Sequence, residues 1–247
     1  MRKTRKAAAV LTAFAMAAVS AVPAMADEIK DLYDYELQSR EIETWNVLYS
    51  QLATDLQVLT NLYDGLLESD EYGKLVPAVA ESWETEDNGI TWTFHLRQGV
   101  KWVDQNGNEK GEVTAQDFLT GLEWVLNFHK NDATNTAMPM EMIEGAEDYY
   151  NMTSELDADA GLALTAESPE FADTVGIKAI DDYTLQYTCV SEKPYFDTVA
   201  TYNCLYPISQ AMIDEIGIDG LRLQHQKISG TMVLIPVLST SSRIQRP

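Results

Sequence analysis

The sequence predicts a mixed α/β or α+β fold, because stretches of alternating apolar and polar residues are interleaved with stretches of helical periodicity. Residues 90–97 alternate strictly, whereas residues 54–67 and 115–128 carry apolar residues at helical spacing. The chain has 247 residues, 45% of them hydrophobic and 23% charged, which allows one large or two modest domains with cores of their own. This composition excludes disordered and fibrous proteins.

The charge is strongly acidic and unevenly spread. The formal net charge is −22, from 17 Lys and Arg against 39 Asp and Glu. Residues 1–26 and 221–247 contain no acid, so residues 27–220 hold 9 bases and all 39 acids, a net charge of −30. Such a surface repels phosphates, and we therefore expect no nucleic-acid partner.

Residues 1–26 read as a signal peptide. Four basic residues precede an apolar run at 7–19, and Ala24-Met25-Ala26 supplies the small residues that a signal peptidase accepts. The alternative, a membrane anchor, is disfavoured because the run is shorter than the ~20 residues that cross a bilayer. No cysteine precedes Cys189, so a lipoprotein signal is absent. We expect cleavage after Ala26 and a periplasmic or extracellular product.

Export leaves two alternatives for the two cysteines. Cys189 and Cys204 could form a disulfide in an oxidising compartment. Alternatively, each is a buried free thiol that packs as a small apolar side chain, since alternation places Leu185, Tyr187 and Cys189 on one face of a strand. The spacing does not decide between them, and it matches neither a zinc site nor a redox dithiol motif.

The first elements are a helix and a strand. Residues 54–67 are expected to be helical, with Thr54 and Gln57 as a capping box, and the preceding residues 45–53 to be strand or loop. Residues 90–97 are expected to form a half-buried strand with Trp92 and Phe94 facing inward, entered through a turn at 87–89.

The later elements alternate between helix and strand. A turn at 104–108 precedes a helix that is capped by Thr114 with Asp117 and runs to about residue 128, with Phe118 on its apolar face. Residues 141–173 are acidic and predict a helical or partly mobile surface insertion. A hairpin follows at 175–190 with its turn at 181–182, and then a short helix, 210–216, that ends at Gly217.

The sequence offers no signature of catalysis. It has three histidines, and it lacks a Gly-x-Ser-x-Gly elbow, a His-Glu-x-x-His pair, a phosphate-binding loop and a dinucleotide fingerprint. The many carboxylates are best explained as solvated surface. We therefore expect no enzyme, no cofactor and no metal ligands, and keep a secreted hydrolase with an unrecognised carboxylate site as the alternative. A third hypothesis is a non-binding remnant or a structural surface protein.

Several segments, in this order and spacing, resemble the extracytoplasmic solute-binding proteins of peptide and nickel ABC importers, especially the oligopeptide-binding proteins. The segments are NLYDGLL at 61–67, LVPAVAESW at 75–83, TWTFHLRQGVKW at 91–102, VTAQDF at 113–118, residues 175–183, and PYF at 194–196. The turn at 104–112 is longer than the family usually has. The resemblance covers most of residues 40–217.

The resemblance implies a periplasmic-binding-protein type II-like α/β fold, of which this chain holds only the first lobe and its inserted subdomain. It implies that lobe I starts in 27–67, that 68–197 form the inserted subdomain, and that 198–220 return to lobe I. It also implies an oligopeptide ligand, partnership with the membrane permease subunits of an ABC transporter, and a monomer. Nickel, haem or a sugar stays open as the ligand.

The resemblance also implies a ligand-binding segment. In the family, a peptide backbone pairs with an extended segment just before the Leu-Tyr-Asp-Gly helix, a mode of β-augmentation. The matching residues here are Gln51, Leu52, Ala53 and Thr54. The alternative is that these four residues are only a loop leading into a helix cap.

The last 27 residues, 221–247, have an anomalous composition. A shifted reading frame near 227–235 is compatible with a family-like Tyr-Asn-Gly-x-Tyr sequence, and a genuine short tail is the alternative. With the second lobe missing, we expect the chain to bind its solute weakly or not at all. We also expect apolar surface near Tyr187, Phe196 and Tyr206 to be partly exposed.

Overall fold

The computed structural model describes residues 42–104, 107–132, 134–223 and 237–238. All of them belong to one compact unit, residues 37–247. The predicted signal peptide at 1–26 and the proposed frame shift at 227–235 lie outside the described residues.

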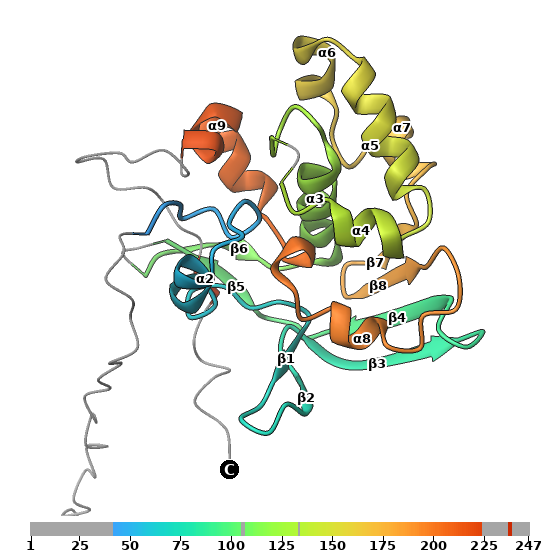
Figure 1. Cartoon of the computed structure of the whole chain (residues 1–247). Helices are drawn as coiled ribbons and strands as arrows, with labels where there is room; N and C mark the ends of the chain where they lie inside the picture. Colours follow the sequence, from blue (N-terminus) through green and yellow to red (C-terminus); the bar gives the residue numbers. More distant parts are fainter. Residues whose placement is uncertain (1–41, 105–106, 133, 224–236, 239–247) are drawn as a thin grey trace, which may run out of the picture. The chain divides into compact units, whose positions relative to one another are not determined.

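The largest sheet among the described residues is four-stranded and antiparallel (Figure 1). Its strands, in spatial order, are β3 (Ala80–Glu86), β4 (Thr91–Leu96), β8 (Thr184–Thr188) and β7 (Ile177–Asp181). The predicted alternation is confirmed, since Trp92, Phe94 and Leu96 are each at most 3% exposed while their neighbours are half-buried. The turn from β3 to β4 carries positive φ at Asp87 and Asn88, a conformation that Asp and Asn tolerate better than most residues.

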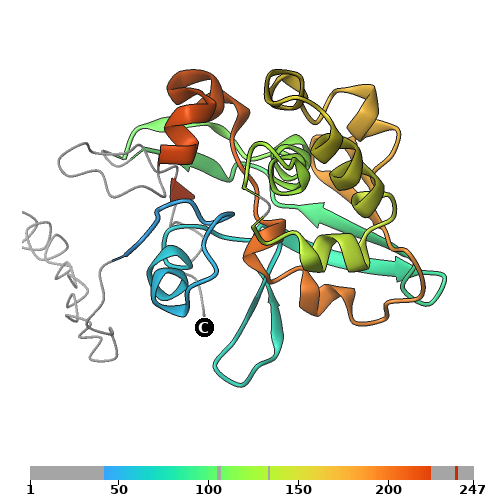
Figure 2. The same ribbon diagram turned by 45° about the horizontal axis from the view of Figure 1, so that its top comes forward.

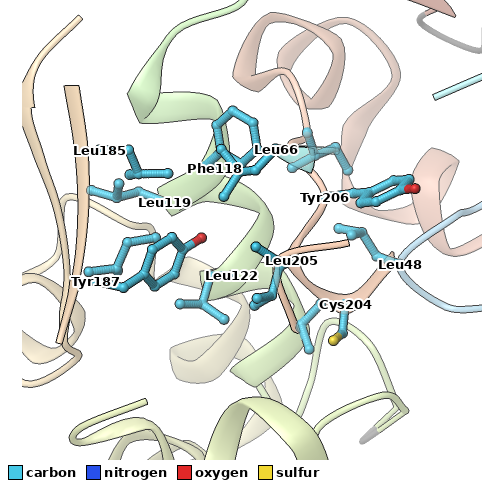
Figure 3. Packing of buried hydrophobic residues seen from close by; sticks show 14 of the residues in the cluster. Leu48, Leu66, Phe118, Leu119, Leu122, Leu185, Tyr187, Cys204, Leu205 and Tyr206 are labelled. Carbon is cyan, nitrogen blue, oxygen red and sulfur yellow. The ribbon is translucent and has the colours of Figure 1, made fainter. Parts of the chain in front are cut away.

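Helix α3 (Ala115–Leu126) packs against one face of the sheet. The predicted capping box of Thr114 and Asp117 is present at its start. The prediction of a single apolar face was incomplete, because α3 is buried on nearly every side. Figure 3 shows the reason: Phe118 and Leu122 lie between Tyr187 of the sheet and a second layer that contains Leu48, Leu66, Leu205 and Tyr206. A helix covered on both sides needs apolar residues all round.

Gly121 allows the returning chain to cross α3 closely. A Cβ at this position would lie 2.3 Å from the backbone oxygen of Tyr206, a distance that real side chains do not reach. The crossing is fixed by a hydrogen bond of 3.0 Å from the Ile208 N–H to the Asp117 carbonyl oxygen. The glycine inside α3 therefore reflects close packing of backbone on backbone.

Four short helices follow α3, as predicted for the acidic region. They are α4 (Ala137–Met142), α5 (Ala146–Glu155), α6 (Ala158–Ala163) and α7 (Pro169–Ala172). They are more than a solvated surface, because Tyr149 and Phe171 are fully buried and their rings meet edge to face at 5.1 Å. These aromatic residues attach the acidic helices to α3.

Two smaller sheets lie beside the main one. Strands β1 (Leu67–Ser69) and β2 (Leu75–Pro77) form a hairpin, and the other sheet contains β6 (Glu109–Glu112), β5 (Lys101–Val103) and β9 (Val237–Leu238). In the predicted turn between β5 and β6, Asp104 accepts the Asn108 backbone N–H at 2.9 Å. Strand β1 begins where the sequence had predicted the end of a helix.

The chain returns through α8 (Phe196–Val199), the 3-10 helix η1 (Asn203–Leu205) and α9 (Gln210–Leu223). Gly217 interrupts α9 with φ 75° and ψ 166°, so the predicted break is present, but a further helical turn follows it. The expected exposure of apolar surface was wrong, because Tyr187 and Phe196 are fully buried and Tyr206 is 5% exposed. Residues 196–208 themselves cover this part of α3 and the sheet.

Both cysteines are free and buried, which decides against the disulfide alternative in this structure. The sulfur of Cys204 lies 3.9 Å from that of Met138. Burial raises the pKa of the Cys189 thiol to about 11 and that of Cys204 to about 12. Both groups therefore pack as neutral, apolar side chains.

Candidate ligand-binding site

The predicted ligand-binding residues lie at the start of helix α2 (Ala53–Leu59). Gln51 is exposed and Leu52 is half-buried with an extended backbone, φ −89° and ψ 126°. Ala53 is exposed but is the first residue of the helix, and Thr54 is buried in its first turn. The prediction of an extended segment is thus correct for Leu52 and wrong for Ala53 and Thr54, which are helical.

The beginning of α2 also differs from the predicted capping box of Thr54 and Gln57. Leu52 occupies the cap position and makes no side-chain capping bond. Instead, the Asp55 carboxylate accepts the Ser50 hydroxyl at 3.0 Å and the Glu43 N–H at 3.1 Å. These bonds draw Asp55 toward the preceding chain and start the helix one residue before Thr54. The helix ends at Leu59, well before the predicted residue 67, because the chain then turns into β1.

The backbone at this helix start is available for pairing. The first N–H groups of any helix have no acceptor within the helix, and here they belong to exposed Ala53 and to its neighbours. The preceding Leu52 is already extended. The Leu52 N–H donates to Ser50 Oγ and its carbonyl oxygen accepts the Leu56 N–H, so the main-chain groups offered to a ligand are those of the exposed residues on either side of it, Gln51 and Ala53.

Residues 46–52, which we call the anchored segment, form a turn that leads into this edge. The backbone N–H groups of Tyr49 and Ser50 both donate to the Asn46 carbonyl oxygen at 3.1 Å. Three carbonyl oxygens of the turn, at Val47, Leu48 and Ser50, accept hydrogen bonds from distant side-chain amides. The segment is therefore held in place by other parts of the chain.

The donors are three asparagines. Asn203 in η1 donates to Val47 O at 2.6 Å and to Ser50 O at 3.0 Å. Asn135 donates to Leu48 O at 2.7 Å and to Ser50 O at 3.1 Å, and Asn131 donates to Leu48 O at 3.2 Å. Both ribbon views place η1 between the blue start of the described chain and α4 (Figures 1 and 2).

A pocket of about 320 Å³ opens beside Gln51. Its lining combines polar and apolar side chains from three parts of the chain: Gln51, Asn135, Thr136, Ala137, Met138, Tyr202, Asn203 and Cys204. Tyr202, 48% exposed, adds an aromatic surface to it. A main-chain edge next to such a mixed pocket is suited to an extended ligand with a side chain that enters the pocket.

Sequence reasoning missed Asn131, Asn135 and Asn203. None stands in a recognisable motif, and asparagine is common in loops for local reasons. Asn135 has φ 58°, a left-handed conformation that asparagine adopts readily, so a local turn would have been the natural interpretation. Their role becomes visible only when residues more than 80 positions apart are brought together.

In the described part of the chain, no three His, Cys, Asp or Glu side chains are grouped so as to hold a metal ion. Across the same residues, no helix has both the length and the apolar character that a membrane crossing requires.

Comparison with known sequences identifies relatives of this chain. AmiA of Streptococcus pneumoniae, an oligopeptide-binding protein, is 35% identical over 211 residues, which are 85% of this chain and 29% of AmiA. The periplasmic oligopeptide-binding protein OppA of Escherichia coli is 34% identical over 157 residues, 64% of this chain and 25% of OppA. The chain thus spans less than a third of the length of these relatives.

Solved structures show the same fold. The substrate-binding domain of an oligopeptide ABC transporter from Bacillus anthracis matches with a TM-score of 0.58 and 28% identity, over 74% of this chain and 31% of that one. Haemophilus influenzae OppA in complex with the peptide RPPGFSPFR matches with a TM-score of 0.57 and 28% identity, over 72% and 30%. The expected periplasmic-binding-protein fold is therefore confirmed for the part that this chain covers.

The family is established by a match over most of the described residues. Residues 74–230 match the bacterial extracellular solute-binding proteins, family 5 (middle). The resemblance inferred from the segments at 61–118 and 175–196 agrees with this match. The chain belongs to the family 5 bacterial extracellular solute-binding proteins.

Proposed function

We propose that this chain is part of a solute-binding component that captures oligopeptides for an ABC importer, and that Gln51, Leu52, Ala53 and Thr54 contribute main-chain groups to the peptide. The observation that carries the proposal is the exposed edge at Gln51 and Ala53, beside a pocket of about 320 Å³. The names of AmiA and OppA support a peptide as the ligand class.

The main chain rather than particular side chains would recognise the ligand. Backbone pairing places no demand on the ligand's sequence, which suits a protein that takes many peptides. The side chain of Thr54 is buried, so its contribution would come from its backbone. The mixed pocket beside Gln51 would then accept one side chain of the peptide with little selectivity.

The remaining expectations form part of the same proposal. Residues 1–26 direct export and are removed after Ala26, and the mature protein works as a monomer outside the cytoplasm with the permease subunits of the transporter. Residues 27–67 begin lobe I, 68–197 form its inserted subdomain and 198–220 return to lobe I. The names of the relatives give no support to the hydrolase alternative, and we do not propose it.

Replacing Ala53 by proline tests the proposed edge. Ala53 is the first residue of α2, a position where proline is well tolerated, and Leu52 already has the extended backbone that a following proline favours. The variant Ala53→Pro thus removes one N–H with little disturbance of the fold. We expect about tenfold weaker binding of RPPGFSPFR, consistent with the loss of one good hydrogen bond.

The matched control is Ala158→Pro. Ala158 is also exposed and is the first residue of α6, after Asp157 with φ −68° and ψ 160°. Peptide affinity should not change in this variant. Ligand-observed NMR detects millimolar dissociation constants, so it also tests the expectation that the chain binds weakly. Equal affinity in both variants would remove the edge from the proposal, and tighter binding of nickel, haem or a sugar than of RPPGFSPFR would overturn peptide as the ligand class.

A further inference from the structure

The turn of the anchored segment has more backbone acceptors than its own donors can satisfy. Val47, Leu48 and Ser50 are buried, so their carbonyl oxygens need partners within the protein. No described strand pairs with residues 46–52. In a sheet a neighbouring strand would donate these hydrogen bonds, and here three asparagine side chains donate them instead.

Asn135 and Asn203 bind the turn in the same way. An amide nitrogen carries two hydrogens, and Asn135 and Asn203 use both of them to bridge two carbonyl oxygens each. Both bridges end on the same atom, Ser50 O, directly before Gln51. The position of Ser50 is thus defined by two donors from separate parts of the chain.

The side chain of Ser50 is fixed from the opposite direction. Its hydroxyl donates to Asp55 in α2 at 3.0 Å and accepts the Leu52 N–H at 3.2 Å. Ser50 therefore connects the asparagine donors with the first turn of α2. Gln51 and Leu52 lie between these two attachments and have little freedom to move away.

We propose that Asn135 and Asn203 are positioning residues that hold the backbone of Gln51–Thr54 in its ligand-pairing geometry, with Asn131 supporting Leu48. The proposal rests on the function proposed above. A segment already held in its binding conformation loses less entropy when the ligand binds, so the affinity for peptide is higher. The three asparagines make this contribution by holding the anchored segment, and they do not themselves pair with the peptide backbone.

The test uses aspartate replacements in the full chain. Asn135→Asp and Asn203→Asp keep the shape of the side chain but replace the donor nitrogen with a second acceptor, which repels the carbonyl oxygens. For each variant we expect about tenfold weaker binding of RPPGFSPFR, equivalent to about 1.4 kcal/mol. Asn203→Gln keeps the amide donor and should bind more tightly than Asn203→Asp.

Amide hydrogen exchange of the free protein separates positioning from general destabilisation. In both aspartate variants, the hydrogen-bonded amides of Leu52 and Leu56 should exchange at least tenfold faster, whereas those of β4 and β8 should be unchanged. The matched control is Asn61→Asp, since the Asn61 amide also donates to a backbone carbonyl, that of Gln57 at 2.6 Å, but at the far end of α2. This control should leave exchange at Leu52 unchanged.

The outcomes are distinct. Unchanged exchange at Leu52 and Leu56 in both aspartate variants overturns the positioning role, as does faster exchange spread evenly over the sheet. If the wild-type chain binds another solute more tightly than peptide but exchange changes as expected, the proposed function fails while the anchoring of the segment stands. If one aspartate variant does not fold, the other provides the same two measurements, because each asparagine makes its own bridge to Ser50.

Discussion

The four-stranded sheet and the anchored segment satisfy buried backbone groups in different ways. In the sheet, β4 is paired with β3 on one side and with β8 on the other, so donors and acceptors come from neighbouring strands. In the anchored segment, side-chain amides of Asn131, Asn135 and Asn203 replace a neighbouring strand. The sheet is therefore stabilised by many equivalent bonds, whereas the segment depends on a few particular residues.

This difference has a functional meaning. A segment that is paired with a strand on one side can accept a ligand only on its other edge. It also moves whenever the sheet moves. A segment held by amide side chains keeps a short backbone edge exposed while its inner groups are satisfied. We expect the binding edge to be more sensitive to single substitutions than the sheet.

The largest predicted effect concerns the polar cluster around Glu123 in the last turn of α3, shortly before Asn131 and Asn135. Glu123 is 2% exposed and accepts hydrogen bonds from Lys130 at 2.6 Å and from Asn127 and Tyr149 at 2.9 Å. Glu123→Ala leaves the Lys130 ammonium buried without its carboxylate, and we expect the free energy of unfolding to fall by about 3–5 kcal/mol. Urea unfolding measures it.

The exposed pair of Lys110 and Glu215, 3.2 Å apart, provides the control. Lys110→Ala should change the free energy of unfolding by less than about 1 kcal/mol. The Glu123 variant also tests the difference between the four-stranded sheet and the anchored segment, because Asn131 and Asn135 follow shortly after Glu123. Amides of the anchored segment should exchange faster before those of β4 do, and the reverse order would contradict the proposed dependence.

The second prediction concerns the pH dependence of stability that Asp117, in the first turn of α3, contributes. Burial raises the pKa of Asp117 from 3.8 to about 6, although its carboxylate accepts the Trp102 indole N–H at 3.1 Å and the Thr114 N–H at 2.9 Å. Because the folded pKa is the higher one, the folded state binds more protons between these values. This contribution to stability is complete below pH ~4 and is lost as the pH rises through about 6.

Comparison with Asp117→Asn isolates this effect, because the other titrating groups cancel in the difference. The free energy of unfolding of the wild type, relative to that of the variant, should fall by roughly 2–3 kcal/mol from pH 4 to pH 7. Urea titrations at several pH values measure it. If the difference in the free energy of unfolding does not change with pH, the hydrogen bonds from Trp102 and Thr114 cancel the effect of burial on the pKa of Asp117.

The smallest effects come from two buried tyrosines. The Tyr149 hydroxyl donates to Glu123 at 2.9 Å, whereas the Tyr187 hydroxyl has no hydrogen-bond partner among the described residues. Tyr149→Phe should lower the free energy of unfolding by about 1.5–3 kcal/mol, and Tyr187→Phe should raise it by about 1 kcal/mol. Thermal or urea unfolding gives both values. A loss of stability in Tyr187→Phe would show that its hydroxyl is satisfied in solution.

Three of the four strands of the sheet could be predicted from the sequence because their signals are local, whereas β3 was not predicted. The alternation in residues 90–97 and the hairpin at 175–190 each lie within a few residues of chain, and the Thr114–Asp117 cap is a short motif. The family resemblance added the order of the elements. These features depend on neighbours in sequence, so reading the sequence was sufficient.

The binding edge could be predicted only in part. Its location was counted back from a family motif, but the start of α2 at Ala53 depends on Asp55 and its bonds to Ser50 and Glu43. The anchoring asparagines and the burial of α3 on both sides depend on contacts between distant residues. No local pattern encodes such contacts, which explains both the misplaced cap at Thr54 and the wrongly expected exposure of Tyr206.

Amide hydrogen exchange with and without saturating RPPGFSPFR tests the central claim most directly, because the unit contains other strand edges as internal controls. Strands β3 and β7 are the outer strands of the four-stranded sheet and could also pair with a peptide. The account predicts peptide-dependent protection of amides at Gln51–Thr54 and none at β3 or β7. Protection of β3 or β7 with no change at Gln51–Thr54 would contradict it.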